Sequence, residues 1–105
     1  MKTITQEEVK KKLTRKIDFS NMDLRKISFR GFCLDGCDFS NSNLIGVDFS
    51  GLTLSNISFK SADLTDCDFD YCDLNDVDFR GAKIENIDFN SVETGYCMFD
   101  GDDEL

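Results

Sequence analysis

Every fifth residue of this 105-residue chain, from position 19 to position 99, is large and apolar with one exception, Thr94. Phe alternates with Leu or Ile along this column, and no insertion interrupts it. A second column, two residues earlier in each group of five, is also apolar except for Ser42. The other three positions of each group are mostly small, polar or charged.

A helix repeats every 3.6 residues and a strand every two, so a period of five is typical of neither. Gly31, Gly36 and Gly46 share one position of the group with Asn21 and Asn41, and both residue types are typical of turns. We infer that the chain turns after every five residues and keeps two side chains of each group inward. Such a chain winds into a coil, and stacked coils bury the inward side chains.

The five-residue group resembles the repeat of the pentapeptide-repeat family, as in Ala62-Asp63-Leu64-Thr65-Asp66. The resemblance covers residues 17–101. It implies an all-β fold, a right-handed quadrilateral β-helix of about four coils with four pentapeptides, or twenty residues, in each coil. The chain departs from the family pattern at Thr94, where the last coil weakens, and in having Phe at every second central position.

A twenty-residue coil predicts that residues twenty positions apart stack on one another. Two opposite faces would then carry ladders of Phe, and the other two would carry ladders mainly of Leu. Stacked rings at the ~4.8 Å spacing of strands pack in the manner of a steric zipper. The two Phe ladders are Phe19, Phe39, Phe59, Phe79, Phe99 and Phe29, Phe49, Phe69, Phe89.

The N-terminal segment lacks the repeat and has helix signals instead. Thr5 and Glu8 form a capping box, which predicts a helix from about residue 5 to residue 16. Val9, Leu13 and Ile17 form an apolar stripe along it, which suits a cap over the open end of a solenoid. The alternative is a basic docking helix. The predicted parts of the chain are the capping helix (1–16), the pentapeptide-repeat β-helix (17–101) and an acidic tail (102–105).

The chain has no histidine, which excludes Ser-His-Asp and Cys-His catalysis and histidine metal ligands. Cys37, Cys67, Cys72 and Cys97 fall in the second inward column, where cysteine packs as a small apolar residue. Cys33 alone takes an outward position, as an accessible thiol. We expect no catalytic residue, no cofactor and no metal site. Because no secretory signal or membrane-spanning stretch is present, we expect a cytoplasmic protein.

The formal net charge of −9 is unevenly distributed. Residues 1–16 carry a net charge of +4, residues 17–60 carry −1 and residues 61–105 carry −12. The family's preference for Asp or Asn before the central residue explains part of this acidity. It does not explain acidic residues at freer outward positions, such as Asp66, Asp70 and Asp76.

A regular acidic rod suits a DNA mimic, which occupies the DNA-binding surface of another protein. The chain is similar in this respect to the quinolone-resistance and gyrase-inhibiting members of the family, which resemble B-form DNA and bind DNA gyrase. We expect a non-enzymatic protein whose partner is a basic DNA-binding protein or complex. Gyrase, a defence nuclease and a repressor are the candidates. The predicted contact residues are Asp48, Asp63, Asp66, Asp68, Asp70, Tyr71, Asp73, Asp76, Asp78 and Asp88, with Tyr71 as an aromatic anchor.

The alternative function is a scaffolding module that makes ordinary protein–protein contacts without mimicry of DNA. Tyr96, Met98 and Phe99 lie near the weak last coil and would form an apolar end suited to homodimerisation. In either case we expect no direct binding to nucleic acid or to membranes, because the excess negative charge repels phosphate.

Overall fold

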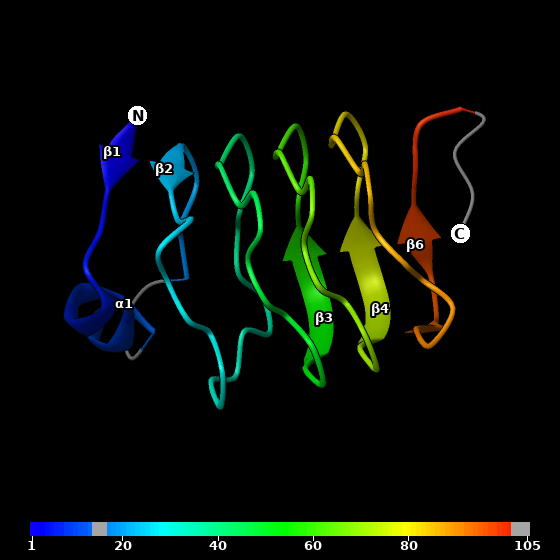
Figure 1. Cartoon of the computed structure of the whole chain (residues 1–105), viewed down its shortest axis with the longest axis horizontal. Helices are drawn as coiled ribbons and strands as arrows, with labels where there is room; N and C mark the ends of the chain where they lie inside the picture. The colour runs from blue at the N-terminus through cyan, green and yellow to red at the C-terminus, as the bar shows by residue number, and fades with distance from the viewer. Residues whose placement is uncertain (14–16, 102–105) are drawn as a thin grey trace.

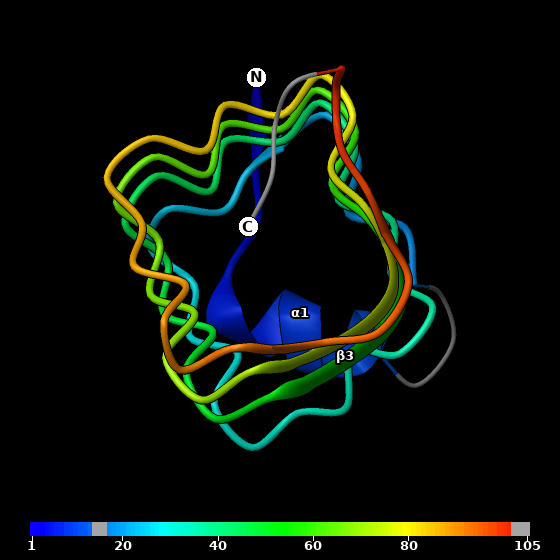
Figure 2. The same ribbon diagram turned by 90° about the vertical axis from the view of Figure 1, so that its right-hand side faces the viewer.

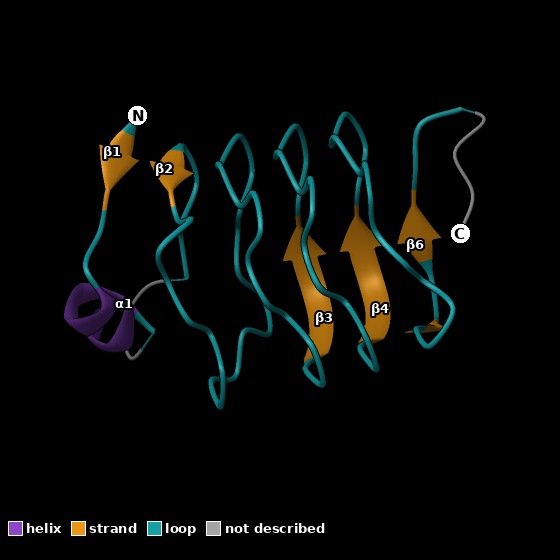
Figure 3. Cartoon of the chain, in the orientation of Figure 1, coloured by secondary structure: helices purple, strands orange, loops and turns teal. Residues whose placement is uncertain are grey.

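The computed structural model describes residues 1–13 and 17–101 as a column of stacked coils that begins with a short helix (Figures 1 and 3). The helix is α1 (Gln6–Lys12), and the strands are β1 (Lys2–Thr3), β2 (Met22–Asp23), β3 (Thr53–Ser58), β4 (Asp73–Asp78), β5 (Glu93–Thr94) and β6 (Cys97–Met98). The molecule measures 36 × 25 × 20 Å. The strands are short because the chain turns a corner about every five residues.

Each strand pair is parallel and joins residues that are twenty positions apart. In the pair of β3 and β4, Leu54 lies opposite Leu74, and the isolated bridges repeat the same interval, as between Asp48 and Asp68. The interval confirms the predicted coil of twenty residues. The fold is therefore the right-handed quadrilateral β-helix that the family resemblance implies, and an end-on view shows its coils superposed (Figure 2).

The four sides of the stacked coils form four faces, which we number in chain order. Their central residues point inward and share one column for each face. The columns, from face 1 to face 4, are Phe19, Phe39, Phe59, Phe79, Phe99; Leu24, Leu44, Leu64, Ile84; Phe29, Phe49, Phe69, Phe89; and Leu34, Leu54, Leu74, Thr94.

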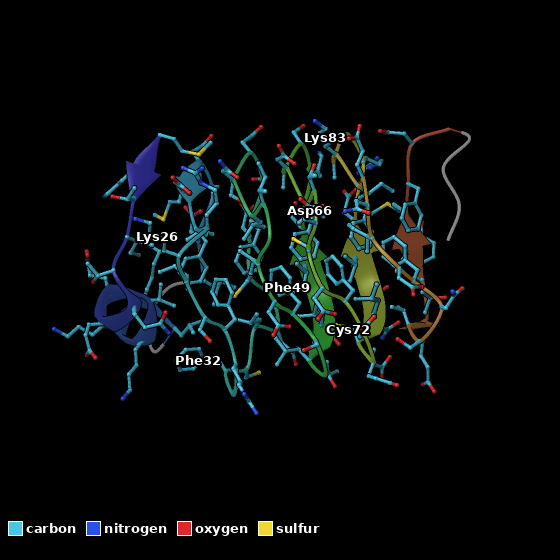
Figure 4. All side chains as sticks on the ribbon, in the orientation of Figure 1. Lys26, Phe32, Phe49, Asp66, Cys72 and Lys83 are labelled. Atoms are coloured by element: carbon cyan, nitrogen blue, oxygen red, sulfur yellow. The ribbon has the colours of Figure 1, made fainter. Side chains whose placement is uncertain are left out.

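Phenylalanine rings fill the interior. Within each ladder the rings stack with centroids 5.0–5.9 Å apart. Rings of the two ladders meet edge to face across the axis at 5.4–6.3 Å. Phe49 in Figure 4 is one of these fully buried rings. Both arrangements suit the quadrupole of an aromatic ring, and together they leave a packed core rather than a channel.

Left-handed backbone forms most corners of the coil. Thirteen residues at five-residue intervals between positions 21 and 86 have φ of 56–79°. Five of them are glycine and four are asparagine, which adopt this conformation at low cost. The exception in the series is Lys26, whose φ is not positive.

Helix α1 begins as the capping box predicts. The Thr5 side chain accepts a hydrogen bond from the Glu8 N–H, and the Glu8 carboxylate accepts one from the Thr5 N–H, both at 3.2 Å. Val9 is fully buried against the coil core. The predicted helix was too long, because α1 ends at Lys12, and residues 14–16 lie outside the described part. Ile17 does not join the buried stripe, since it is 46% exposed.

The last coil is less covered than the others. Ile84, Phe89 and Phe99 are only partly buried, although each continues a column that is fully buried in earlier coils. Thr94 occupies an inward column position but is exposed, in agreement with the weak repeat there. The predicted acidic tail, residues 102–105, lies outside the described residues.

Candidate partner-binding surface

In each group of five, the residue before the central one can stabilise the next corner, because its side-chain oxygen accepts the N–H of the residue two positions further along the chain. The Asp48 carboxylate accepts the Ser50 N–H at 2.8 Å, and the Asp88 carboxylate accepts the Asn90 N–H at 2.8 Å. Asn43 does the same for Ile45 at 3.2 Å. This bond needs an acceptor oxygen and not a charge. The fold therefore explains the preference for Asp or Asn at this position without requiring a carboxylate.

The cations, and not the carboxylates, distinguish the four faces. Within residues 17–101 each face carries four acidic side chains. Faces 1 and 2 also carry five basic ones, which are Arg25, Lys26, Lys60, Arg80 and Lys83. Faces 3 and 4 carry a single basic residue, Arg30. We call these two adjoining faces the acidic side. Its carboxylates belong to Asp35, Asp48, Asp68, Asp70, Asp73, Asp76, Asp88 and Glu93.

The structure places seven of the ten predicted contact residues on the acidic side and three elsewhere. Those on the acidic side are Asp48, Asp68, Asp70, Tyr71 and Asp88 of face 3 and Asp73 and Asp76 of face 4. Asp63 and Asp66 lie on face 2, the face of Lys83 (Figure 4), and Asp78 lies on face 1. Sequence reasoning missed two acidic residues of face 4: Asp35, which follows the central Leu34, and Glu93, which precedes the central Thr94 and lies opposite Asp73.

Asp78 has a structural role. It is 8% exposed, and its carboxylate accepts hydrogen bonds from Nε and an Nη of Arg80 at 3.0 and 2.8 Å. These bonds hold the pKa of Asp78 below its ordinary value. Because its charge is neutralised and recessed, Asp78 has little to offer a partner. Arg80 lies only two residues further along the chain, so the pair was visible in the sequence.

The carboxylates of face 3 repel one another. The pKa of Asp70 is raised, chiefly by the charge of Asp68, with smaller contributions from burial and from Asp88 and Asp48. Hydrogen bonds from the Ser50 hydroxyl and N–H hold the pKa of Asp48 below its ordinary value, so this charge persists in the column. Face 3 therefore concentrates negative charge at a cost to the fold.

Tyr71 occupies the corner that ends face 3 in the third coil. Its side chain is 78% exposed, and its backbone is left-handed with φ of 60°. The Ser91 hydroxyl accepts its N–H at 3.0 Å. A bulky residue in this conformation is uncommon and strained, and nothing in the packing of the coil requires a ring there.

The cysteines divide as their positions predict. Cys67 and Cys72 (Figure 4) are buried and donate S–H hydrogen bonds to carbonyl oxygens of the preceding coil, at 3.0 and 2.8 Å. Burial raises the pKa of Cys37 and of Cys67 to about 12. These thiols stay protonated and are poor nucleophiles. Cys33 is exposed on face 4.

Within residues 1–13 and 17–101, no group of three or more Cys, Asp or Glu side chains is arranged to hold a metal ion. The only helix of this part, α1, is too short to cross a membrane.

The predicted dimer residues lie in the last coil, at the C-terminal end of the column. Tyr96 is 64% exposed, while Met98 and Phe99 are half-buried. The Phe99 ring stacks on Phe79 at 5.0 Å. Because no further coil follows within the described residues, the outer surface of this ring ends the ladder.

Comparisons with known proteins agree with the fold. A family model described as a pentapeptide repeat region matches residues 32–103. The crystal structure of a pentapeptide repeat protein (Rfr23) from the cyanobacterium Cyanothece 51142 is similar over 79% of this chain and 57% of its own, with a TM-score of 0.73 and 19% identity. This similarity shows a shared fold. No curated protein matches the chain.

Two further solved structures are similar at lower TM-scores. A pentapeptide repeat protein of the Arabidopsis thaliana thylakoid lumen has 30% identity and a TM-score of 0.46, over 78% of this chain and 54% of its own. QnrB1, a plasmid-mediated fluoroquinolone resistance protein, has 19% identity and a TM-score of 0.31, over 79% and 48%. The chain thus spans about half the length of the structures it matches.

Proposed function

The chain belongs to the pentapeptide-repeat family, and on that premise we propose that it is a non-enzymatic DNA mimic that occupies the DNA-binding surface of another protein. The observation that carries the proposal is the charge of the acidic side, which carries eight carboxylates and one basic side chain, Arg30. Lys and Arg side chains that normally bind phosphates would contact these carboxylates instead. A DNA-binding partner works in the compartment that holds the DNA, and a cytoplasmic protein, as predicted above, could meet it there.

The charge density supports this proposal. Residues 61–101 form about two coils and carry eleven acidic and two basic side chains. Two coils advance about 10 Å along the axis at the spacing of strands. The net charge therefore amounts to roughly one per ångström, against about one per 1.7 Å of B-form DNA. A basic groove that binds a DNA duplex would therefore encounter at least as high a density of negative charge on these two coils as on the duplex.

The carboxylates exceed what the fold needs. An amide performs the corner-stabilising role at Asn43, so Asp68 and Asp88 could be Asn without loss of that hydrogen bond. The raised pKa of Asp70 shows that the charges repel. Retention of charge at a cost in stability is typical of a surface that is used for binding.

The test measures binding of the labelled protein to DNA gyrase, to a restriction endonuclease and to a repressor, by fluorescence anisotropy. We expect at least one to bind, duplex DNA to compete, and affinity to fall steeply between ~50 and ~300 mM salt. Asp70→Asn with Asp76→Asn should weaken binding, since both lie on the acidic side. Asp66→Asn with Glu85→Gln removes the same charge from face 2 and should change binding little.

Binding to none of the three proteins would contradict the proposal, and so would a complex that is indifferent to salt and to competing DNA. Equal effects of the two double variants would show that net charge acts without regard to the face. Either of the first two results would favour the second candidate function.

The second candidate is a scaffold that associates through its C-terminal end. The partly buried Ile84, Phe89 and Phe99 favour it, because an apolar coil end is a surface that a second copy can cover. Phe99→Asp should then convert a dimer into a monomer, as measured by light scattering. An unchanged mass would exclude this end as the interface.

A further inference from the structure

A pocket of about 560 Å³ opens at the N-terminal end of the column, at the first corner between faces 2 and 3. It lies between the segment that joins β1 to α1 and the first corner of face 2. The lining residues are Thr3, Ile4, Thr5, Gln6, Asp23, Arg25, Lys26 and Ile27. Its volume is within the range of sites for small molecules.

The pocket exists because the segment that precedes the first coil covers only part of it. β1 pairs with β2 in the usual register, with Lys2 opposite Met22 and Thr3 opposite Asp23. Ile4, twenty residues before Leu24, still packs against the core. The chain then enters α1 instead of forming a corner, and its trace runs inside the outline of the coils (Figure 2). The corner at Arg25 and Lys26 therefore has no coil beneath it.

This corner also differs in its backbone. Lys26 is the one member of the corner series from residue 21 to residue 86 whose φ is not positive. In the same column, the N–H groups of Gly46 and Asp66 donate to carbonyl oxygens of the next coil, Thr65 and Glu85, at 2.9 and 3.1 Å. The Lys26 N–H makes no such bond within the described residues.

Both differences are those expected when the central peptide of a turn is rotated, as between type I and type II turns. The rotation reverses the direction of the Lys26 N–H. It turns this donor away from the next coil and toward the N-terminal side, where the pocket lies. The Lys26 side chain also lies at this end of the molecule (Figure 4).

The charged groups of the pocket leave one positive charge unmatched. Arg25 donates to both carboxylate oxygens of Asp23, at 2.8 and 2.7 Å, so these two charges cancel. The hydrogen bond from Arg25 lowers the pKa of Asp23 to about 2, so the pair stays ionised. Lys26 is exposed and adds a second cation. The surroundings reinforce it, since residues 1–30 carry a net charge of +5.

We propose that this pocket binds a small organic carboxylate. The anion lies against the Lys26 ammonium and N–H with the hydroxyls of Thr3 and Thr5, and the hydrocarbon portion lies against Ile4 and Ile27. One unmatched positive charge balances one carboxylate, whereas a phosphate dianion would leave an excess of negative charge beside Asp23. None of the eight carboxylates of the acidic side lines the pocket, and the site does not depend on the partner proposed for that side.

The test titrates hexanoate into the ¹⁵N-labelled full chain and follows its amide NMR signals. We expect saturable shifts confined to the residues around the pocket, such as Ile4, Lys26 and Ile27. Hexanol, which has the chain without the charge, and inorganic phosphate should each bind more weakly. Lys26→Gln removes a charge-assisted hydrogen bond and should weaken hexanoate binding roughly tenfold or more.

Two matched variants separate the site from general charge effects. Lys60→Gln removes another exposed lysine, from face 1, and should leave the affinity unchanged, while Lys26→Arg should retain most of it. The spectra also report whether each variant is folded. Shifts that do not saturate, shifts scattered over the other lysines, or equal affinity of Lys26→Gln and the unmodified chain would each overturn the proposal.

Discussion

At the scale of the residue, Tyr71 occupies a corner that suits asparagine better. Its φ of 60° strains a bulky side chain, whereas Asn56 and Asn86 adopt the same conformation in this chain. We expect Tyr71→Asn to raise the free energy of unfolding by about 1 kcal/mol, as measured by denaturation in urea. Tyr96 is similarly exposed without positive φ, so Tyr96→Asn should give no such gain. A loss of stability in Tyr71→Asn would show that the ring packs on the coil.

Two carboxylates should respond to pH in opposite directions. Neighbouring charges raise the pKa of Asp70, so its repulsion destabilises the folded state at neutral pH and fades on acidification. The Asp70→Asn variant should therefore have a higher free energy of unfolding than the unmodified chain at pH 7, with a difference that disappears below the ordinary aspartate pKa.

Asp23 should show the opposite dependence. Arg25 lowers the pKa of Asp23 to about 2, so Asp23→Asn should cost stability above pH 4, and this cost should vanish toward pH 2. Urea unfolding of the three proteins across this range measures both effects.

At the scale of the element, the amide of Gln6 joins helix α1 to the first coil, in addition to the buried Val9. The Gln6 side chain donates to the Ser28 carbonyl at 2.7 Å and accepts the Ser28 N–H at 2.9 Å, in the manner of a neighbouring strand. Gln6→Ala should lower the free energy of unfolding by roughly 1 kcal/mol, because it removes two hydrogen bonds between the helix and the Ser28 backbone, whose groups can then bond to water. Glu7→Ala removes an exposed side chain of the same helix and serves as control. Equal stability of the two variants would show that Gln6 does not fasten the helix.

The start of this helix was predictable and its attachment was not. Thr5 and Glu8 stand three residues apart, so a local rule identifies the capping box. Gln6 and Ser28 are separated by 22 residues, and their contact depends on where the helix docks. The same limit explains Ile17, which continues the apolar pattern of the sequence but is largely exposed.

At the scale of the whole molecule, the five-residue repeat predicted a coil, and its resemblance to the pentapeptide-repeat family implied the twenty-residue register and with it both Phe ladders. Assignment of every carboxylate to a face follows from that register. The prediction placed Asp48, Asp68 and Asp88 on one face, but it took the other contact residues by coil and so combined Asp70 with Asp63 and Asp78. What distinguishes the faces is the placement of cations, which also follows from the register once four faces are established. The rotated corner at Lys26 could not be predicted, because it depends on a coil that is missing beneath it.

Salt should act on the fold and on the complex in opposite directions. With a net charge of −9, self-repulsion opposes the folded state, and added salt screens it. We expect the Tm to rise between ~20 and ~500 mM NaCl, while affinity for a DNA-binding partner falls over the same range. Asp70→Asn with Asp76→Asn should reduce both slopes, because it removes charge from the side where carboxylates lack cations. Calorimetry and anisotropy in the same buffers measure the two slopes. A Tm that falls with salt would show that the ion pairs of Arg25 and Arg80 outweigh the repulsion of the acidic side.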